Sequence, residues 1–126
     1  MNRVIHFEVQ AEKPEKLSEF YKKIFGWIIS KKAVGNEDYW LIATGTASER
    51  GINGGLKRRT QKQAGMVPTI EVADLDRAVE EIRAQGGTLL EKKKSLPGTG
   101  FLAYCSDPEG NAFAILQYDD SVKSEF

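Results

Sequence analysis

The side chains best suited to chemistry in this 126-residue sequence are His6, Glu8 and Cys105. His6 is the only histidine, and an imidazole titrates near neutral pH, which suits a proton carrier or a metal ligand. Glu8 follows two residues later, and a carboxylate in an enclosed site has a raised pKa that suits a general base. The alternatives are a histidine hydrogen-bonded to a neighbour and a carboxylate that reaches solvent or pairs with a basic side chain. Cys105 has no activating base beside it in sequence, which favours an inert thiol.

His6 and Glu8 occupy one face of a predicted strand over residues 4–11. Residues 5, 7, 9 and 11 are apolar and alternate with the polar residues between them. A period of two residues is typical of a strand with one buried face. The next segment predicts a helix, because Pro14 suits a first turn, apolar residues recur at helical spacing from Leu17 to Phe25, and Gly26 is a good left-handed stop.

The rest of the chain predicts further strands and a second helix. The second helix follows Asp74, a plausible N-cap, and ends at Gly86. Turn residues stand at Gly35 and Asn36, and the polar stretch 57–65 is typical of a linker. Adjacent glycines at 54 and 55 predict a strand that is weakened or bulged. The remaining strands are predicted over 27–30, 39–44, 52–56, 67–73, 88–91, 101–105 and 112–117.

The two halves of the sequence repeat one order of elements: strand, helix, then three strands. Adding 61 to the residue numbers lays 5–26 over 66–87 without a gap, so that His6 corresponds to Val67 and Gly26 to Gly87. Two unrelated amphipathic units would also align in phase, but repetition of the whole order favours an internal duplication. We therefore expect one domain over 1–126, made of two modules at about 3–58 and 65–118.

Composition restricts the classes of function. Eighteen basic and eighteen acidic side chains give a net charge of zero, whereas a nucleic-acid binder usually carries a basic excess. No apolar run approaches the roughly 20 residues that span a membrane. The single cysteine excludes an internal disulfide and, with no signal-like apolar stretch at the N-terminus, predicts a cytoplasmic protein.

Several motifs, taken together and in order, resemble the vicinal oxygen chelate superfamily of glyoxalases, bleomycin-resistance proteins and dioxygenases. They are EFYKKIFGW at 19–27, GINGGL at 51–56 and DPEGNAFAILQ at 107–117. The second and third are most similar to a subgroup related to lactoylglutathione lyase, whose members mostly lack an assigned reaction. The resemblance implies an α+β fold of two βαβββ modules, whose curved mixed sheets enclose a cavity, and a homodimer.

The same resemblance bears on metal binding. Metal-dependent members hold a divalent ion with one residue from the first strand and one from the last strand of each module. His6 matches the first of these positions, while the others fall on Val67, on Ala114 and near Gly54. A single imidazole is too little for a tight site, which requires three or four ligands. We therefore expect no resident cofactor, with a divalent metal on His6 as the alternative.

Other residues are candidates to contact a ligand. Trp40 and Tyr104 occupy similar places in the third strands of their modules, so that one faces the cavity or both pack in the core. Asn53 stands beside two glycines, where a ligand can approach the backbone closely. The predicted ligand-binding residues are Trp40, Asn53, Thr69, Glu71, Tyr104 and Gln117.

The sequence thus predicts a glyoxalase-like protein that binds a small molecule, and it leaves open whether the protein is an enzyme. If it is one, His6 and Glu8 are the predicted catalytic residues. One alternative is a metal-dependent lyase, isomerase or dioxygenase acting on vicinal oxygens. The other is a drug-sequestering protein of the bleomycin-resistance type, which needs no catalytic residue.

Overall fold

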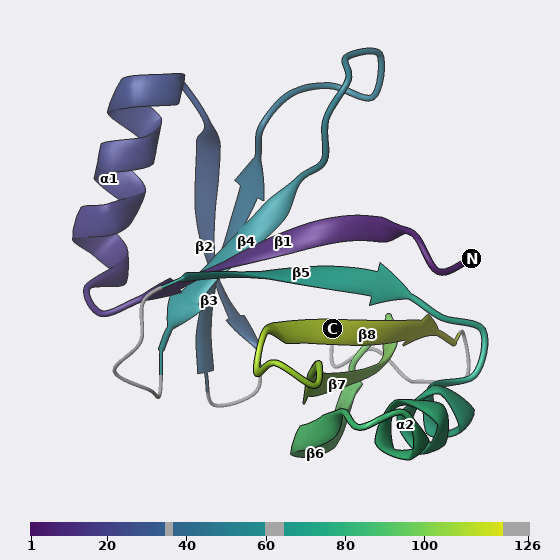
Figure 1. Cartoon of the computed structure of the whole chain (residues 1–126). Helices are drawn as coiled ribbons and strands as arrows, with labels where there is room; N and C mark the ends of the chain where they lie inside the picture. Colours follow the sequence, from purple (N-terminus) through teal and green to yellow (C-terminus); the bar gives the residue numbers. More distant parts are fainter. Residues whose placement is uncertain (35–36, 60–64, 120–126) are drawn as a thin grey trace. The chain divides into compact units, whose positions relative to one another are not determined.

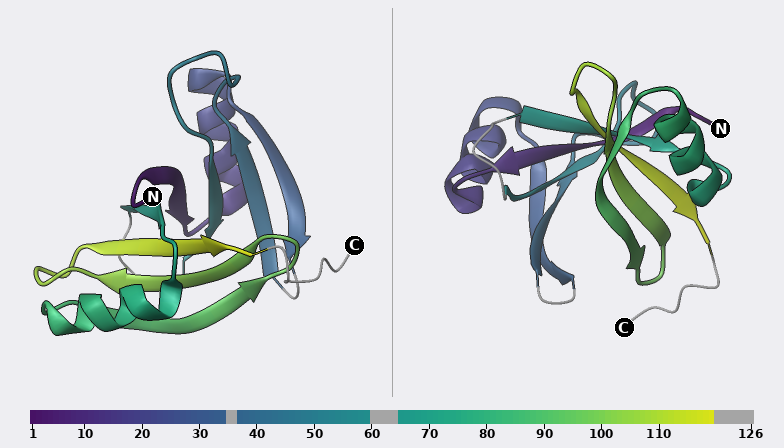
Figure 2. Two further views of the ribbon diagram at one scale, coloured as in Figure 1. Left: turned by 90° about the vertical axis from the view of Figure 1, so that its right-hand side faces the viewer. Right: turned by 60° about the horizontal axis from the view of Figure 1, so that its bottom comes forward.

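A computed structural model describes residues 1–34, 37–59 and 65–119, and the order strand, helix, three strands occurs in it twice. Two βαβββ modules of this kind confirm the predicted α+β fold class, and one helix lies beside each set of strands (Figures 1 and 2). The first module comprises β1 (Val4–Ala11), α1 (Pro14–Phe25), β2 (Ile28–Val34), β3 (Glu37–Ala43) and β4 (Gly54–Arg58). The second comprises β5 (Gly65–Glu71), α2 (Leu75–Ala84), β6 (Thr88–Leu96), β7 (Gly100–Ser106) and β8 (Ala112–Tyr118).

Each module builds a mixed sheet with the same connectivity. The strand order is β2-β3-β4-β1 in the first module and β5-β8-β7-β6 in the second. In each, the first strand pairs in parallel with the last, and the other pairs are antiparallel. The chain forms two compact units, His6–Val67 and Met1–Ile5 together with the chain from Pro68 onward. The N-terminus joins the second unit because Asn2 N donates to Glu71 O at 2.7 Å and Glu71 N donates to Arg3 O at 3.0 Å.

The strand register relates the two modules residue by residue. Glu8 pairs with Gly55, and Thr69 pairs with Ala114. Since Thr69 is the residue 61 positions after Glu8, Gly55 is the counterpart of Ala114. The sequence predicts this last-strand position of the first module near Gly54, and the register assigns it to Gly55.

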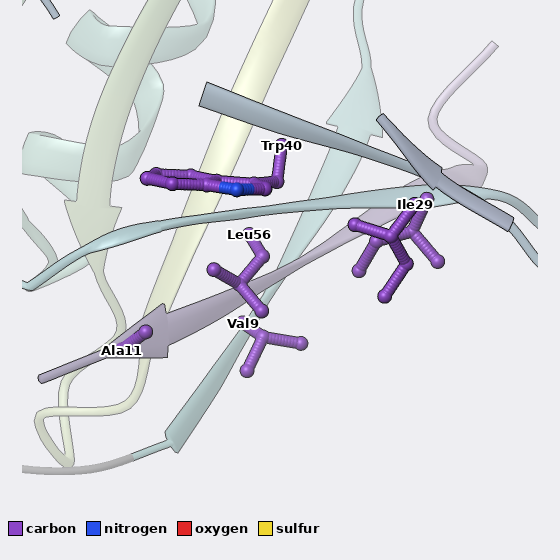
Figure 3. Packing of buried hydrophobic residues seen from close by; sticks show 6 residues of the cluster. Val9, Ala11, Ile29, Trp40 and Leu56 are labelled. Atoms are coloured by element: carbon purple, nitrogen blue, oxygen red, sulfur yellow. The ribbon is translucent and has the colours of Figure 1, made fainter. Parts of the chain in front are cut away.

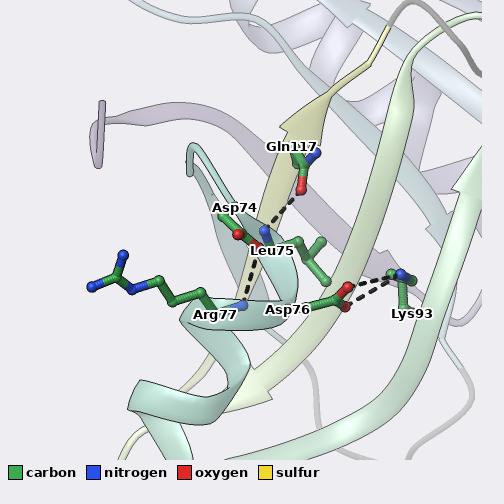
Figure 4. A network of polar contacts seen from close by, with 6 residues as sticks. All are labelled: Asp74, Leu75, Asp76, Arg77, Lys93 and Gln117. Atoms are coloured by element: carbon green, nitrogen blue, oxygen red, sulfur yellow. Dashed lines mark hydrogen bonds and ion pairs between the residues drawn. The ribbon is translucent and has the colours of Figure 1, made fainter.

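The two helices begin differently. Lys13 precedes α1 and provides no side-chain cap, whereas Asp74 Oδ1 accepts a hydrogen bond from Arg77 N at 3.1 Å, which confirms the predicted N-cap of α2. Gln117 Oε1 accepts from Leu75 N at 2.8 Å, so two side chains satisfy N–H groups of the first turn of α2 (Figure 4). Gly26 ends α1 with φ 70°, the predicted left-handed stop.

A hydrophobic cluster fills the space between each helix and its sheet. In the first module α1 contributes Leu17 and Tyr21, and the sheet contributes the residues shown in Figure 3. These buried residues are Val9, Ala11, Ile29, Trp40, Ile42 and Leu56. The corresponding cluster of the second module consists of Val72, Leu75, Val79, Ala103, Cys105 and Ile115.

The strands differ from the prediction mainly in length. β6 runs to Leu96, so the lysine-rich segment after residue 91 continues the strand. β4 ends at Arg58 and β5 begins at Gly65, which shortens the predicted linker. The register of β4 against both neighbours is continuous, so its two glycines form no bulge. The predicted turn at 35–36 and the linker residues 60–64 lie outside the described residues. No helix in the described part of the chain has the length and apolar character to cross a membrane.

Candidate functional site

The first sheet carries polar side chains on the face that does not pack against α1. Phe7, Val9 and Ala11 contribute to the α1 cluster. Since side chains alternate along a strand, the intervening residues of β1 project from the opposite face. We call this surface the polar face and define it by His6, Glu8, Gln10, Tyr39 and Gly55.

The central contact of the polar face joins β1 to β3. His6 Nε2 lies 3.1 Å from the hydroxyl oxygen of Tyr39. β4 lies between these two strands in the sheet. The side chain of Tyr39 therefore crosses β4 to reach His6, and it crosses at Gly55. A Cβ built on Gly55 would lie 1.8 Å from the Tyr39 hydroxyl oxygen and 2.2 Å from its Cζ.

The two adjacent glycines of β4 thus make room for two aromatic rings on opposite faces of the sheet. A Cβ on Gly54 would lie 2.5 Å from the backbone oxygen of Phe7 and 2.7 Å from Cε1 and Cζ of its ring, on the side of α1. A Cβ on Gly55 would meet the ring of Tyr39 on the polar face. The pair of glycines therefore serves close packing, which is a recognised reason for glycine within a strand.

Glu8 adds a carboxylate to this face. It is only 5% exposed. Gln10 Nε2 donates a hydrogen bond to Glu8 Oε1 at 2.5 Å. A buried carboxylate needs such hydrogen bonds, because removing its charge from water is costly. The hydrogen bond from Gln10 thus helps to hold a negative charge next to the His6–Tyr39 contact.

Burial determines the charge of the other two groups. Burial lowers the pKa of His6 below its usual 6.5, so the imidazole is mostly neutral at pH 7. Burial and the negative charge of Glu8 both raise the pKa of Tyr39, so the phenol keeps its hydrogen. At neutral pH the polar face therefore combines a neutral imidazole, a protonated phenol and a carboxylate.

The corresponding face of the second module is chemically different. Val67 and Thr69 replace His6 and Glu8, and Ala114 replaces Gly55. Val67 and Thr69 are 8% and 5% exposed. Tyr104 pairs with Ala114 and is 9% exposed, and the Lys94 Nζ lies 5.5 Å from its ring centroid. Since Ala103 and Cys105 belong to the α2 cluster, Tyr104 faces away from α2.

The remaining predicted ligand-binding residues have structural contacts of their own. Trp40 is 6% exposed and belongs to the α1 cluster. This is the alternative of packing in the core, so Trp40 is left out of the proposed site. The side-chain carbonyl of Gln117 accepts a hydrogen bond from Leu75 N. Asn53 Oδ1 accepts from Thr44 N at 2.9 Å and lines a pocket of about 170 Å³ in the loop between β3 and β4. Glu71 pairs through its backbone with the N-terminal segment.

Cys105 belongs to the core of the second module. It is fully buried and forms no disulfide. Burial raises the pKa of its thiol, and the positive charge of Arg83 offsets only part of this effect. A buried thiol with a raised pKa is a poor nucleophile, as the sequence suggested.

Sequence reasoning missed Tyr39 and Gly55 as members of the site. The available signal was the glycine pair at 54 and 55, because glycine within a strand indicates close approach of another group. The sequence alone did not reveal which ring fills the space, because that depends on the register of three strands.

Comparison with known proteins agrees with this fold. Residues 6–116 match the family model described as the glyoxalase-like domain. The chain therefore belongs to the glyoxalase-like domain family, within the vicinal oxygen chelate superfamily. No curated protein matches the chain.

Solved structures resemble the fold at low sequence identity. A methylmalonyl-CoA epimerase in complex with methylmalonyl-CoA and ammonium matches with a TM-score of 0.66 and 15% identity, over 98% of this chain and 99% of the other. A methylmalonyl-CoA epimerase from Mycobacterium tuberculosis matches at 0.67 and 16%, over 92% and 87%. A hypothetical protein from Bacillus halodurans matches at 0.67 and 10%, over 98% and 99%. At these identities the likeness concerns the fold alone.

The residues at the metal-ligand positions of the superfamily do not fit a divalent ion. Among the described residues, no group of three or more histidine, cysteine, aspartate or glutamate side chains is arranged to hold one. Of the family positions, only His6 is a donor, and its Nε2 already contacts Tyr39. Gly55, at the last-strand position of the first module, offers no ligand, and the ring of Tyr39 fills the space beside it. A donor set of this kind is too small for a tight site.

Proposed function

We propose that the protein binds a small organic molecule at the polar face of the first sheet and needs no divalent metal to do so. The observation that carries this proposal is the contact of His6 with Tyr39 across Gly55, beside the buried carboxylate of Glu8. Binding sites typically combine a few placed polar groups with apolar surroundings. In the first module such polar groups gather on the face opposite the core.

The chemistry of the site is that of hydrogen bonding and proton transfer. A neutral imidazole has one nitrogen that donates and one that accepts a hydrogen bond, and Glu8 provides a further acceptor two residues away. If the bound molecule reacts, His6 and Glu8 remain the proposed catalytic residues: Glu8 accepts a proton from it as general base, and the imidazole of His6 donates a hydrogen bond to it. Thr69, Glu71 and Tyr104 remain proposed ligand contacts of the second module.

A fragment screen read through the single histidine tests the proposal. Protein labelled with ¹⁵N at histidine and ¹³C at tyrosine Cζ is mixed with small fragments that carry carbonyl or hydroxyl groups. A binder is expected to shift the signals of His6 and Tyr39 and to leave that of Tyr118, which is 55% exposed on β8, unchanged. Fragments that raise the melting temperature but leave both His6 and Tyr39 unshifted would place the binding site elsewhere.

We also propose a homodimer, supported by the surface of α1. Phe20, Ile24 and Phe25 are 53%, 59% and 60% exposed, although they continue the apolar stripe predicted for this helix. An exposed apolar surface of this kind favours a protein partner. Light scattering after gel filtration should give twice the chain mass, and Ile24→Lys should give a monomer. A monomeric parent protein would refute this part of the proposal.

The proposed location is the cytoplasm. It is supported by the one cysteine of the chain, which is buried as a free thiol.

A further inference from the structure

The backbone conformation of Gly55 does not explain why a glycine occupies this position. It lies in the middle of the sheet, between β1 and β3, where glycine weakens a strand. Its φ angle is not positive, so any residue could adopt its backbone conformation. What excludes a side chain is the Tyr39 phenol, whose oxygen would lie 1.8 Å from a Cβ at this position. Gly55 is therefore needed for the position of Tyr39.

Both groups in the contact between Tyr39 and His6 are neutral, so the donor strength of the phenol decides which one donates. The phenol retains its hydrogen because its pKa is raised, and the imidazole is neutral because its pKa is lowered. A neutral imidazole has one nitrogen that donates and one that accepts. A phenol is a better donor than acceptor, since the oxygen lone pair is delocalised into the ring. The favoured arrangement has the Tyr39 hydroxyl donating to His6 Nε2 across the observed 3.1 Å.

We propose that Gly55 and Tyr39 are a positioning pair for His6. Gly55 leaves room for the phenol to cross β4, and Tyr39 donates to Nε2, which fixes the remaining imidazole hydrogen on Nδ1. In this tautomer Tyr39 occupies the imidazole nitrogen that carries no hydrogen, which is the one available to a metal ion. A consequence that rests on the proposed function is the class of ligand: the imidazole offers an N–H, so the bound molecule presents an acceptor oxygen such as a carbonyl.

The single histidine makes this proposal directly measurable without any ligand. Two-bond ¹H–¹⁵N spectra of histidine-labelled protein, recorded across pH, give both the tautomer and the pKa of His6. The parent protein is expected to carry its hydrogen on Nδ1 at pH 7.5 and to have a pKa below 6.5. Zinc chloride added at a few equivalents should leave these signals in place.

Two variants should break the pair in the same way. Tyr39→Phe removes the donor, which should raise the pKa of His6 by about 0.5 to 1 and give a mixture of tautomers. Gly55→Ala should displace the phenol and produce the same spectrum. Tyr21→Phe, on the α1 side of the same sheet, is the matched control and should change neither quantity. The charged residues on this side of the sheet, Glu8, Lys32, Glu37 and Lys57, are unchanged in all of these variants.

The outcomes separate this proposal from the proposed function. A parent spectrum with the hydrogen on Nε2 would overturn the proposed direction of donation, and an unchanged spectrum in Tyr39→Phe would overturn the pair itself. If Gly55→Ala does not fold, the parent protein and Tyr39→Phe still decide. Zinc-induced shifts of His6 in the parent protein would show that Tyr39 does not withhold Nε2. Failure to find a binding fragment would count against the proposed function alone, because these spectra contain no fragment.

Discussion

The two modules are alike on one face of the sheet and different on the other. Both bury an apolar cluster beneath a helix, with Leu56 and Ile115 at corresponding positions of the last strand. On the opposite face, the first module has His6 and Glu8 where the second has Val67 and Thr69. The side chains on both helix-covered faces are buried, and so both faces are apolar.

This difference shows which face of the repeated βαβββ module is available for function. Core positions tolerate few changes, because every lost methylene costs free energy of unfolding. The other face is less constrained, and there the first module holds a neutral imidazole, a phenol and a carboxylate. In the second module Val67 and Thr69 stand at the positions of His6 and Glu8, and Glu71 stands at the position of Gln10. We infer that the contact between an imidazole and a phenol is particular to the first module.

The largest expected effect tests the similarity of the two cores. Leu56→Ala and Ile115→Ala should each lower the free energy of unfolding by about 2–5 kcal/mol, since both side chains are almost fully buried. Urea denaturation of each variant measures this loss. If one variant is nearly neutral while the other loses several kcal/mol, the two helix-covered faces are not equivalent.

A smaller effect tests whether Gln117 serves the helix or a ligand. Gln117→Leu removes the acceptor of the Leu75 N–H and should lower stability by about 1–2 kcal/mol. Fragment binding at the polar face should stay unchanged. A variant of normal stability with altered fragment binding would assign Gln117 to the ligand site instead.

The two helix N-termini provide a matched pair of substitutions. Asp74→Ala removes the side-chain cap of α2 and should cost about 1 kcal/mol. Lys13→Ser should add a cap to α1, which lacks one, and gain about 0.5 kcal/mol. Thermal unfolding of both variants gives the comparison. A destabilising Lys13→Ser would mean that Lys13 contributes a contact that outweighs a cap.

The smallest expected effect is the pH dependence that His6 gives the first module. Its pKa is lowered on folding, so the unfolded chain binds more protons below about pH 6.5. The stabilising contribution is complete above that pH and is lost as the pH falls through the folded pKa. The parent protein should therefore lose more melting temperature than His6→Gln between pH 7.5 and pH 5. Parallel losses in the two proteins would contradict the lowered pKa.

The fold could be predicted well because the patterns that indicate each strand and helix lie within a few neighbouring residues. Alternating residues defined β1, and Gly26 and Asp74 marked helix ends that the structure confirms. The contact between His6 and Tyr39 could not be predicted, because it depends on the pairing of β3, β4 and β1. The same limit applies to Trp40 and Tyr104, which the sequence treated as equivalent. Register places Leu41 opposite Gly55 and Tyr104 opposite Ala114, so Leu41, and not Trp40, corresponds to Tyr104.

The length of β6 was underestimated for a different reason. A run of lysines is typical of a solvent-exposed segment, which is why the predicted strand stopped before it. In the strand order of its module, however, β6 is an edge strand with a neighbour on one side only. Edge strands accept such residues because they discourage pairing with other chains. The composition was therefore compatible with a strand that continues to Leu96.

The metal content of the purified protein tests the central claim most directly. Elemental analysis for nickel, zinc, iron and manganese should give far less than one ion per chain, and dialysis against EDTA should leave the His6 spectrum unchanged. One tightly bound ion per chain, whose removal shifts the signals of His6, would contradict the account, because Tyr39 would then not be the partner of that imidazole.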